Sequence, residues 1–223
     1  MCGRYSVTHT AAAIAERFEV ETIAGFEPRY NAAPSQNLPV VRRADGTGRK
    51  VDCLRWGLIP FWAKEKKIGY RMINARSETA AAKPSFRNAF KSRRCLVVAD
   101  GFYEWVKRDG EKWPMRVTFG GGELGAFAGL WERWTDEDGE EVETYTILTA
   151  DAAPTLQHLH DRMPVWAPEE YWDSWLFDDE HARENLEMMV DDFPQNAVDC
   201  YGVSRELNRP QNDRPELIEP LGG

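Results

Sequence analysis

The sequence lacks any apolar run close to the roughly 18 residues that a membrane-spanning helix requires. Its N-terminus also lacks the charged-then-apolar pattern of a secretory leader. Internal repeats, low-complexity tracts and linkers rich in proline or serine are missing too. These absences predict a soluble, cytoplasmic protein with no membrane partner, which folds as one domain over residues 1–223.

Cysteine is scarce and scattered. The four cysteines, Cys2, Cys53, Cys95 and Cys200, show neither the close spacing of a zinc cluster nor the pattern of a disulfide framework. Reduced thiols fit a cytosolic compartment. We therefore expect no metal site and no cofactor. With 42% hydrophobic residues, the chain can form one sizeable core.

Positive charge is in deficit overall, but it is concentrated in the middle of the chain. The formal net charge is −9, yet Val41–Arg116 holds 19 Lys and Arg against 8 Asp and Glu. Residues Val117–Gly223 hold 6 against 25. Because the field at a site depends on local charge, a basic middle segment can hold a polyanion on an acidic protein. The alternative is a solvated surface whose signs happen to segregate along the sequence.

Strand-like patterns dominate the middle of the chain. Asp-Gly pairs at Asp45-Gly46, Asp109-Gly110 and Asp138-Gly139 suit the positive φ angles of tight hairpins, so the strands around them are expected to pair antiparallel. The predicted strands are Leu38–Arg43, Val51–Leu58, Cys95–Ala99, Phe102–Lys107, Met115–Phe119, Ala126–Trp134, Val142–Leu148 and Val198–Val203.

Helical patterns occur at both ends of the chain. The predicted helices are Ala11–Phe18 behind a Thr8 or Thr10 cap, Ala153–His158, Pro168–Leu176 and Glu180–Met189. Gly25–Pro39, punctuated by prolines, is expected to be an ordered loop. Together the elements predict an α+β fold, a curved, mostly antiparallel sheet or open barrel with peripheral helices packed outside.

Cys2 is a distinctive chemical feature because it follows the initiator methionine. If Met1 is removed, Cys2 carries a free α-amine and a thiol two carbons apart. That pair can condense with an aldehyde through the amine and then close a five-membered ring through the thiol. It is also a candidate N-terminal nucleophile. The alternative is a small apolar residue at a frayed terminus.

Asn74-Ala75-Arg76-Ser77-Glu78-Thr79 follows the basic stretch Lys64–Arg71. Asn74 and Arg76 could orient a phosphate or a sugar oxygen, with arginine giving a two-pronged contact. The alternative is a helix start with Asn74 as its N-cap.

Glu104 lies in the strand-like segment Asp100-Gly101-Phe102-Tyr103-Glu104-Trp105. Strand alternation puts Phe102, Glu104 and Val106 on one face, so the carboxyl group has apolar neighbours. A half-buried carboxyl group there holds its proton to higher pH, which suits a general acid or base. The alternative is a solvent-facing glutamate.

Leu159-His160-Asp161-Arg162-Met163-Pro164 carries the most concentrated chemistry. His160 can transfer protons near neutral pH, and Asp161 or a backbone carbonyl could orient it. Arg162 is one of only six basic residues after Val117, and Pro164 predicts that His160 and Arg162 emerge at a helix end. A lone histidine is also common as a purely structural residue.

Six motifs occur in an order that resembles the SRAP family, the SOS-response-associated peptidase domain. The resemblance runs from residue 1 to the Val203-Ser204 region. The motifs are Met1-Cys2-Gly3-Arg4-Tyr5, Arg29-Tyr30-Asn31-Ala32-Ala33-Pro34, Trp56-Gly57-Leu58-Ile59-Pro60-Phe61-Trp62, Asn74-Ala75-Arg76-Ser77-Glu78-Thr79, Gly101-Phe102-Tyr103-Glu104-Trp105 and His160-Asp161-Arg162-Met163-Pro164.

This resemblance implies a DNA-repair function: binding of single-stranded DNA, with a preference for junctions to duplex, and covalent cross-linking to abasic sites. By this resemblance, Cys2 is the reacting residue and forms a thiazolidine that shields the lesion. The catalytic residues that line its pocket would be Asn74, Glu104 and His160. Weak lyase and autoproteolytic activity, a monomeric state and association with the nucleoid when DNA is bound are further expectations.

The resemblance also implies a set of DNA contacts. Three arginines, Arg4, Arg76 and Arg162, would hold phosphates of the DNA backbone. Asn31 and Pro34 would shape the wall of the pocket, and Trp62 would stack on a base. One departure from the family pattern is the loop Ala63–Arg71, which is more basic and lacks a second tryptophan after Trp62.

Two other functions are compatible with parts of the sequence. An N-terminal-nucleophile amidohydrolase also starts with Cys-Gly, but it generally needs a longer, sandwich-type domain and a synthase partner. A non-enzymatic single-strand binding module would use Trp62 and the basic middle segment and would bind intact and abasic DNA alike.

Overall fold

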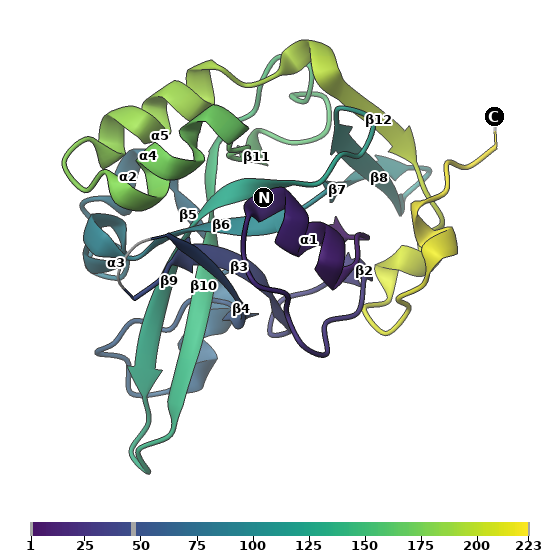
Figure 1. Ribbon diagram of the computed structural model, residues 1–223. Helices are drawn as coiled ribbons and strands as arrows, with labels where there is room; N and C mark the ends of the chain where they lie inside the picture. Colours follow the sequence, from purple (N-terminus) through teal and green to yellow (C-terminus); the bar gives the residue numbers. More distant parts are fainter. Residues whose placement is uncertain (1, 46–47, 223) are drawn as a thin grey trace.

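The computed structural model describes residues 2–45 and 48–222. Its strands are β1 (Tyr5–Val7), β2 (Arg29–Ala32), β3 (Asn37–Arg43), β4 (Arg49–Trp56), β5 (Asn74–Arg76), β6 (Arg94–Ala99), β7 (Gly101–Arg108), β8 (Glu111–Phe119), β9 (Gly125–Thr135), β10 (Glu141–Asp151), β11 (Arg162–Pro164) and β12 (Val198–Gly202). In Figure 1, α4 and α5 gather on one side of the strands, and the long β9–β10 hairpin projects away from them.

The helices are short. They are α1 (Ala11–Phe18), α2 (Ser77–Ala80), α3 (Arg87–Ser92), α4 (Trp172–Phe177), α5 (Ala182–Asp191), and the 3-10 helices η1 (Lys66–Arg71), η2 (Glu169–Tyr171), η3 (Gln195–Ala197), η4 (Arg205–Asn208) and η5 (Pro215–Ile218). Among these described helices, none is long and apolar enough to cross a membrane.

Five strands close into a barrel. β3 pairs antiparallel with β4 and β6, β6 pairs with β9, and β9 pairs with β10. The ring closes where β10 runs parallel to β4, with Tyr145 opposite Trp56. The predicted α+β class with a curved, mostly antiparallel sheet is confirmed. The barrel is closed rather than open, and its one parallel contact joins strands linked by a long connection, as parallel pairing requires.

A second sheet, entirely antiparallel, has the order β12-β8-β7-β1-β2. Tyr5 of β1 lies opposite Phe102 of β7, and the Tyr103 amide donates to the Arg4 carbonyl at 3.0 Å. Arg4 thus lies opposite Tyr103, and one residue further toward the N-terminus the same register brings Gly3 beside Glu104. The sheet therefore fixes the path of the N-terminal segment.

The barrel core is aromatic where the N-terminal strand enters it. The Tyr5 ring meets Trp56 edge-on at 5.0 Å between centroids, and its hydroxyl is 2.6 Å from the Tyr145 hydroxyl. Trp56 stacks on Tyr145 with a centroid distance of 6.4 Å. All three side chains are buried, so β1 is anchored through a large apolar ring and a satisfied hydroxyl.

The Asp-Gly hairpins form where the sequence predicts them. Asp109 and Gly110, with φ of 52° and 79°, join β7 to β8, and Gly139, with φ of 85°, lies in the turn between β9 and β10. The third predicted turn, Asp45-Gly46, extends outside the described residues.

Two local predictions are wrong. Ala153–His158 forms successive turns rather than a helix, because β10 continues through Asp151 and β11 begins at Arg162, so the segment must reverse the chain. Gly25–Pro39 contains β2 and the start of β3 rather than only a loop. Pro39 is tolerated in β3 because β6 pairs with that strand only from Val40 onward.

The other helix predictions hold. α1 covers the predicted residues, and Thr10 is its cap, accepting a hydrogen bond from the Ala13 amide at 3.2 Å. η2 with α4 and α5 correspond to the two predicted late helices, and β12 corresponds to the predicted last strand.

Asp100, between β6 and β7, ties the N-terminal strand to the sheet. It is completely buried and accepts hydrogen bonds from the hydroxyls of Ser6 and Thr8 at 2.6 and 2.8 Å. It also pairs with Arg116 at 3.0 Å and contacts His9 Nδ1 at 3.2 Å. Burial alone would raise the pKa of Asp100, but these hydrogen bonds and the nearby guanidinium hold the pKa below its ordinary value.

Replacing Asp100 with asparagine should lower the free energy of unfolding by about 3–5 kcal/mol at pH 7, because Arg116 is left buried without its partner. Urea unfolding measures this. The lowered pKa means that the carboxylate stabilises the fold above its ordinary pKa and loses that contribution as pH falls through the folded-state value. The gap between wild type and variant should therefore narrow in acid. Asp173→Asn, which breaks a solvent-exposed pair with Arg49, should cost less than about 1 kcal/mol.

Candidate active site and nucleic-acid surface

Cys2 is buried rather than frayed. Its side chain is 0% exposed, and its Sγ donates to the Arg4 carbonyl at 3.7 Å. Burial raises the pKa of the thiol, and the negative charge of Glu104 raises it further. The alternative of a disordered terminus is therefore wrong. At neutral pH the sulfur is therefore held as a thiol, and a thiolate could form there only with a nearby base.

Glu104 is that nearby carboxyl group. Strand β7 places it at 6% exposure, in a part of the strand that is buried on both faces. Burial raises the pKa of Glu104, and the positive charge of His160 opposes this increase. The solvent-facing alternative is wrong. Electrostatic interactions of Glu104 with both Cys2 and His160 show that the three groups lie in one neighbourhood.

Asn74 clamps the backbone of the cysteine. It opens β5, which runs parallel to β10 with Asn74 opposite Ile147, and its Nδ2 donates to the Cys2 carbonyl at 2.7 Å. The N-cap alternative is wrong, because α2 begins only at Ser77. Asn74 Oδ1 is a buried acceptor with no donor among the described residues. An acceptor left in this state beside Cys2 is available for a ligand.

His160 precedes β11 and has two partners for one ring nitrogen. The Arg162 amide donates to Nδ1 at 2.9 Å, while Asp161 Oδ1 lies 2.6 Å from the same atom. The first contact needs a lone pair on Nδ1 and the second needs a proton. The neutral ring therefore accepts from Arg162, and the protonated ring donates to Asp161. Each protonation state has a partner, as proton transfer requires. The predicted helix end is a turn instead.

The guanidinium of Arg162 has protein carboxylates as partners, whereas the resemblance implies a DNA phosphate. Its guanidinium is already bonded to the carboxylates of Glu78 and Asp151, with Nη1 2.6 Å from an oxygen of each. It also donates to the Thr149 carbonyl at 2.5 Å. With these bonds in place, the side chain holds α2 and the end of β10 against β11. Both terminal nitrogens of the guanidinium are therefore occupied, which leaves no pair of N–H donors free for the phosphate contact that the resemblance implies.

Asn31 is buried and Arg4 is half-buried, and both lie against the C-terminal segment. Asn31 is completely buried, and its Nδ2 donates to the carbonyls of Leu207, Arg209 and Asn212. Its Oδ1 accepts from Arg4 Nη1 at 2.7 Å. The buried amide thus has all its hydrogen bonds within the protein and orients Arg4 instead of contacting a ligand.

Pro34 shapes a tight turn between β2 and β3. Ser35 follows it with φ of 75°, and the Gln36 amide donates to the Ala33 carbonyl at 3.3 Å, which is a type II turn with proline in its favoured position. The turn is tied to the barrel because the Ser35 amide donates to the Trp56 carbonyl at 2.9 Å.

Similarity to known proteins agrees with the six motifs. A family model described as SOS response associated peptidase (SRAP) matches residues 1–210. The chain belongs to the SRAP family. It is 41% identical to the abasic site processing protein YoqW of Bacillus subtilis (strain 168), over 98% of this chain and 99% of the relative. It is 32% identical to the abasic site processing protein HMCES of Xenopus tropicalis, over 88% of this chain and 67% of that longer protein.

Solved structures share the SRAP fold of this chain. A protein from Bacteroides thetaiotaomicron has a TM-score of 0.87 at 24% identity and covers 99% of this chain and 100% of its own. A second, from Bordetella bronchiseptica, has a TM-score of 0.76 at 27% identity over 91% of this chain and 100% of its own. The overall fold of this chain is therefore shared with these structures.

An aromatic surface on the SRAP domain surrounds the predicted stacking residue. Trp62 is 48% exposed, whereas the other eight tryptophans, all within the described residues, are less exposed. Phe61 and Tyr70 beside it are 55% and 63% exposed. Sequence reasoning missed these two, although Phe61 adjoins Trp62 and Tyr70 ends the basic loop. Flat, exposed rings beside cations are the usual platform for unpaired bases.

Two glycines set the position of this loop. Gly57 has φ of 119°, and a Cβ at Gly57 would lie 2.7 Å from the Gly69 carbonyl oxygen. A Cβ at Gly69 would in turn lie 2.6 Å from the Gly57 oxygen. Between them, Ala63 packs with Trp134, whose indole N–H donates to the Ala63 carbonyl at 2.6 Å. The β9–β10 hairpin thus supports the loop that carries Trp62.

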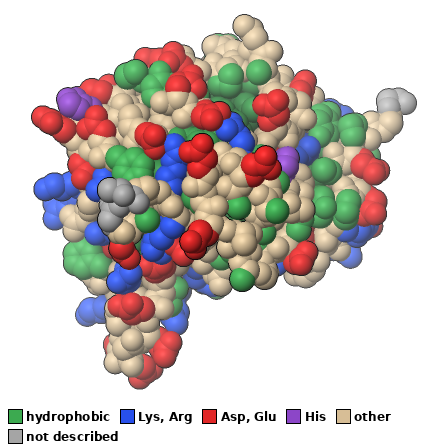
Figure 2. All heavy atoms as spheres, in the orientation of Figure 1, with side chains coloured by type: hydrophobic (Ala, Val, Ile, Leu, Met, Phe, Trp, Pro, Cys, Tyr) green, Lys and Arg blue, Asp and Glu red, His purple; other side chains and the backbone are tan. Residues whose placement is uncertain are grey.

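Most arginines of the basic middle segment pair with carboxylates, many from the acidic half of the chain. Acidic and basic side chains accordingly interleave on the face in Figure 2. The paired arginines are Arg42, Arg43, Arg49, Arg93, Arg94 and Arg116. In the described part of the chain, Lys64, Arg71 and Arg76 have no such partner. The same holds for cations elsewhere in the segment, namely Arg55, Lys83, Arg87, Lys91, Lys107, Arg108 and Lys112. The cations available to a polyanion therefore include those around Trp62 and on β5.

Substituting Gly57 with alanine should displace the Trp62 loop and weaken binding of intact single-stranded DNA. The methyl group meets backbone at 2.7 Å, and the positive φ adds a strain of about 1–3 kcal/mol. Gly110→Ala is the matched control, since it has the positive φ but nothing within 4 Å. Both variants should lose stability in urea, but only Gly57→Ala should lose affinity in fluorescence anisotropy. Equal affinities would contradict the positioning role of the glycine pair.

Proposed function

We propose that this chain binds single-stranded DNA and cross-links covalently to abasic sites through Cys2 once Met1 has been removed. The observation that carries the proposal is the hydrogen bond from Asn74 to the Cys2 carbonyl, which holds a buried aminothiol residue beside Glu104 and His160. The relatives named abasic site processing proteins supply the substrate class.

In the first step, the α-amine of Cys2 attacks the C1′ aldehyde of the ring-opened sugar. An α-amine has a reference pKa of about 7.7–8.0, so a neutral fraction is present at pH 7. The carbinolamine loses water and gives an imine between the Cys2 nitrogen and C1′. His160 supplies and removes the protons at the sugar oxygen, and its alternating Nδ1 partners keep the ring in place in both states.

In the second step, the Cys2 sulfur adds to C1′ and closes a thiazolidine. The C–S bond forms as the thiol proton passes through Glu104 to the imine nitrogen. A base is needed because burial raises the pKa of the thiol, and Glu104 also raises it. The nitrogen and sulfur belong to one residue, so ring closure has the advantage of proximity. Asn74 Oδ1, a buried acceptor, is suited to the N–H of the new ring.

Arg76 and Trp62 are the proposed primary DNA contacts. Arg76 is exposed, follows Asn74 on β5, and suits the phosphate beside the lesion. Trp62 stacks on a neighbouring base, with Lys64 and Arg71 on the same loop attracting the backbone. Arg4, Asn31, Pro34 and Arg162 shape the pocket from behind through the contacts described above.

Side reactions follow from the imine. β-Elimination from that intermediate would give weak lyase activity, and ring closure suppresses it. Glu104 would also serve autoproteolytic removal of a residue that precedes Cys2. A monomer in the cytoplasm that joins the nucleoid when DNA is bound, with junctions to duplex among its sites, completes the proposal.

Intact mass spectrometry with and without an abasic oligonucleotide tests this function. The expected spectrum without DNA lacks Met1, and the spectrum with abasic DNA gains the oligonucleotide mass minus one water. The adduct should survive denaturation without borohydride. Glutaminase turnover in the absence of DNA, or equal binding of intact and abasic strands without an adduct, would favour the amidohydrolase or the plain binding module instead.

Replacing Trp62 with alanine should weaken binding of intact single-stranded DNA about 5- to 150-fold, because stacking on one aromatic ring contributes about 1–3 kcal/mol. Fluorescence anisotropy at fixed salt measures the change. Met188→Ala removes another exposed apolar side chain, on α5, and should leave affinity unchanged. At saturating DNA the adduct yield of Trp62→Ala should match wild type, and an unchanged affinity would remove Trp62 from the interface.

A further inference from the structure

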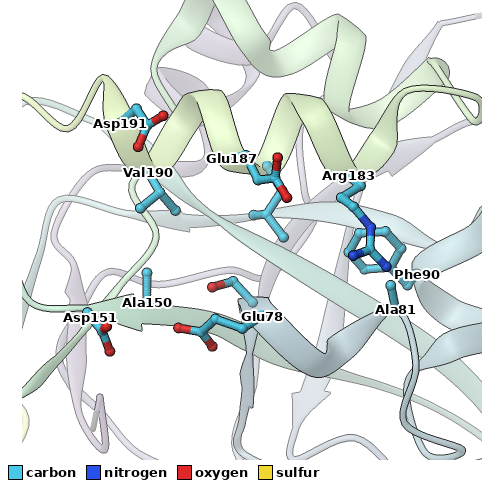
Figure 3. A pocket seen from close by; sticks show the side chains of 11 residues that line it. Glu78, Ala81, Phe90, Ala150, Asp151, Arg183, Glu187, Val190 and Asp191 are labelled. Carbon is cyan, nitrogen blue, oxygen red and sulfur yellow. The ribbon is translucent and has the colours of Figure 1, made fainter.

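A pocket separate from the Cys2 neighbourhood lies between α5 and the end of β10. It encloses about 450 Å³, and its floor is apolar, formed by five side chains. In Figure 3 the helix α5 forms one wall, and β10 with the start of α2 forms the other. The floor residues are Ala81, Phe90, Ala150, Leu186 and Val190. The volume accommodates one or two aliphatic side chains.

Carboxylates line both walls of this pocket. Glu187 and Asp191 stand four residues apart on α5, so they share one face of the helix. Glu78 and Asp151 lie on the opposite wall, as Figure 3 shows. Arg183 is the one cationic residue of the lining. A nucleic acid would be repelled here, whereas a cation with an apolar neighbour would be attracted.

The carboxylates of the two walls are not equivalent. Glu78 and Asp151 hold Arg162, and the hydrogen bond from Arg162 lowers the pKa of Glu78, which keeps it charged. Glu187 and Asp191 have no cationic partner among the described residues. The pocket therefore has an apolar floor and, on its α5 wall, two carboxylates that no cation of the described residues neutralises.

We propose that this pocket docks a basic, apolar segment of a partner protein. A leucine-sized side chain fills the floor, and flanking lysines or arginines pair with Glu187 and Asp191 on α5. A polypeptide segment fits better than a small cation, because the carboxylates are spaced along a helical face and an apolar group is required between them. The lining contains neither Cys2 nor Trp62, and its Ser77 and Glu78 directly follow Arg76 in the chain.

Docking there is linked to His160 through Arg162, the first residue of β11. A lysine or arginine in the pocket competes with Arg162 for Glu78 and Asp151. The Arg162 amide donates to His160 Nδ1, so a shift of Arg162 reaches the imidazole through one hydrogen bond. The Arg162 amide resonance is therefore a reporter of occupancy that needs no DNA.

The test is titration of the full chain, by two-dimensional amide NMR, with a capped hexapeptide of alternating lysine and leucine. We expect saturable shifts at pocket residues and at the Arg162 amide. Glu187→Gln combined with Asp191→Asn should weaken binding at least tenfold. Glu184→Gln, on the same helix but outside the lining, should bind as wild type does.

Three outcomes would overturn the docking site. The first is equal binding of the matched glutamate–leucine peptide, and the second is unchanged affinity of the double variant. The third is a set of shifts confined to residues outside the pocket. The amide spectrum of each variant reports whether it is folded, so lost binding is separated from lost structure. The result is independent of the cross-linking chemistry, because no DNA is present.

Discussion

Replacing Cys2 with alanine should abolish the stable adduct with abasic single-stranded DNA. The variant retains an α-amine after Met1 removal and can still form an imine, but it has no sulfur to close the ring. Denaturing gels without borohydride should therefore show no cross-link, while borohydride should trap the imine. Binding of intact DNA should be unchanged, because the Cys2 side chain is fully buried and the aromatic surface around Trp62 does not include it.

Two companion variants make the Cys2 result specific. Cys53→Ala removes an exposed thiol and should cross-link like wild type. Cys2→Ser keeps the size of the side chain and should give a borohydride-dependent product only. A Cys2→Ala protein that cross-links as well as wild type without borohydride would exclude the thiazolidine.

Glu104→Gln should slow adduct formation by about 10²- to 10⁴-fold, the usual contribution of one general acid–base group. The amide keeps the shape of the side chain but cannot relay the proton from the thiol to the imine nitrogen. Single-turnover rates over a pH series measure this. Glu132→Gln is the control, since Glu132 is similarly buried but pairs with Arg93 away from Cys2. A rate within twofold of wild type would remove Glu104 from the reaction.

The raised pKa of Glu104 makes the free energy of unfolding depend on pH in the opposite direction to Asp100. Its folded-state pKa lies above the ordinary glutamate value because of burial. The native state therefore binds the proton more tightly than the unfolded chain does. That contribution is complete below the ordinary pKa and is lost as pH rises through the folded-state value. Glutamine is neutral throughout, so Glu104→Gln should unfold at higher urea than wild type near pH 8.

Local features of the structure were predictable from the sequence because their causes are local. The apolar spacing and threonine cap of Ala11–Phe18 define α1, and the Asp-Gly pairs fix two hairpins. Strand alternation placed Glu104 on one face with Phe102 and Val106, but it left open whether that face is buried; the structure buries both faces of β7 there. The grouping of Cys2 with Asn74, Glu104 and His160 was also predictable, since the ordered motifs of a known family name these residues even when the fold that joins them is unknown.

The remaining features depend on partners distant in sequence. Nothing near Arg162 indicates that Glu78 and Asp151 will occupy its guanidinium, so the residue read as a phosphate ligand. The segregated charges suggested a basic face, but tertiary contacts such as Arg94–Asp179 cancel much of it. Barrel closure between β4 and β10 involves strands about ninety residues apart. Such pairings have no local sequence signal.

The Asn31 contacts have a consequence for how the protein is made. Three carbonyls within residues 207–212 receive the Asn31 amide, and Arg4 is held in turn by Asn31 and by the Leu207 carbonyl. A ribosome delivers these carbonyls long after it has delivered the cysteine. The nascent N-terminus therefore stays without its final support until translation is nearly complete, and a prematurely terminated chain should carry a cysteine that is present but poorly seated.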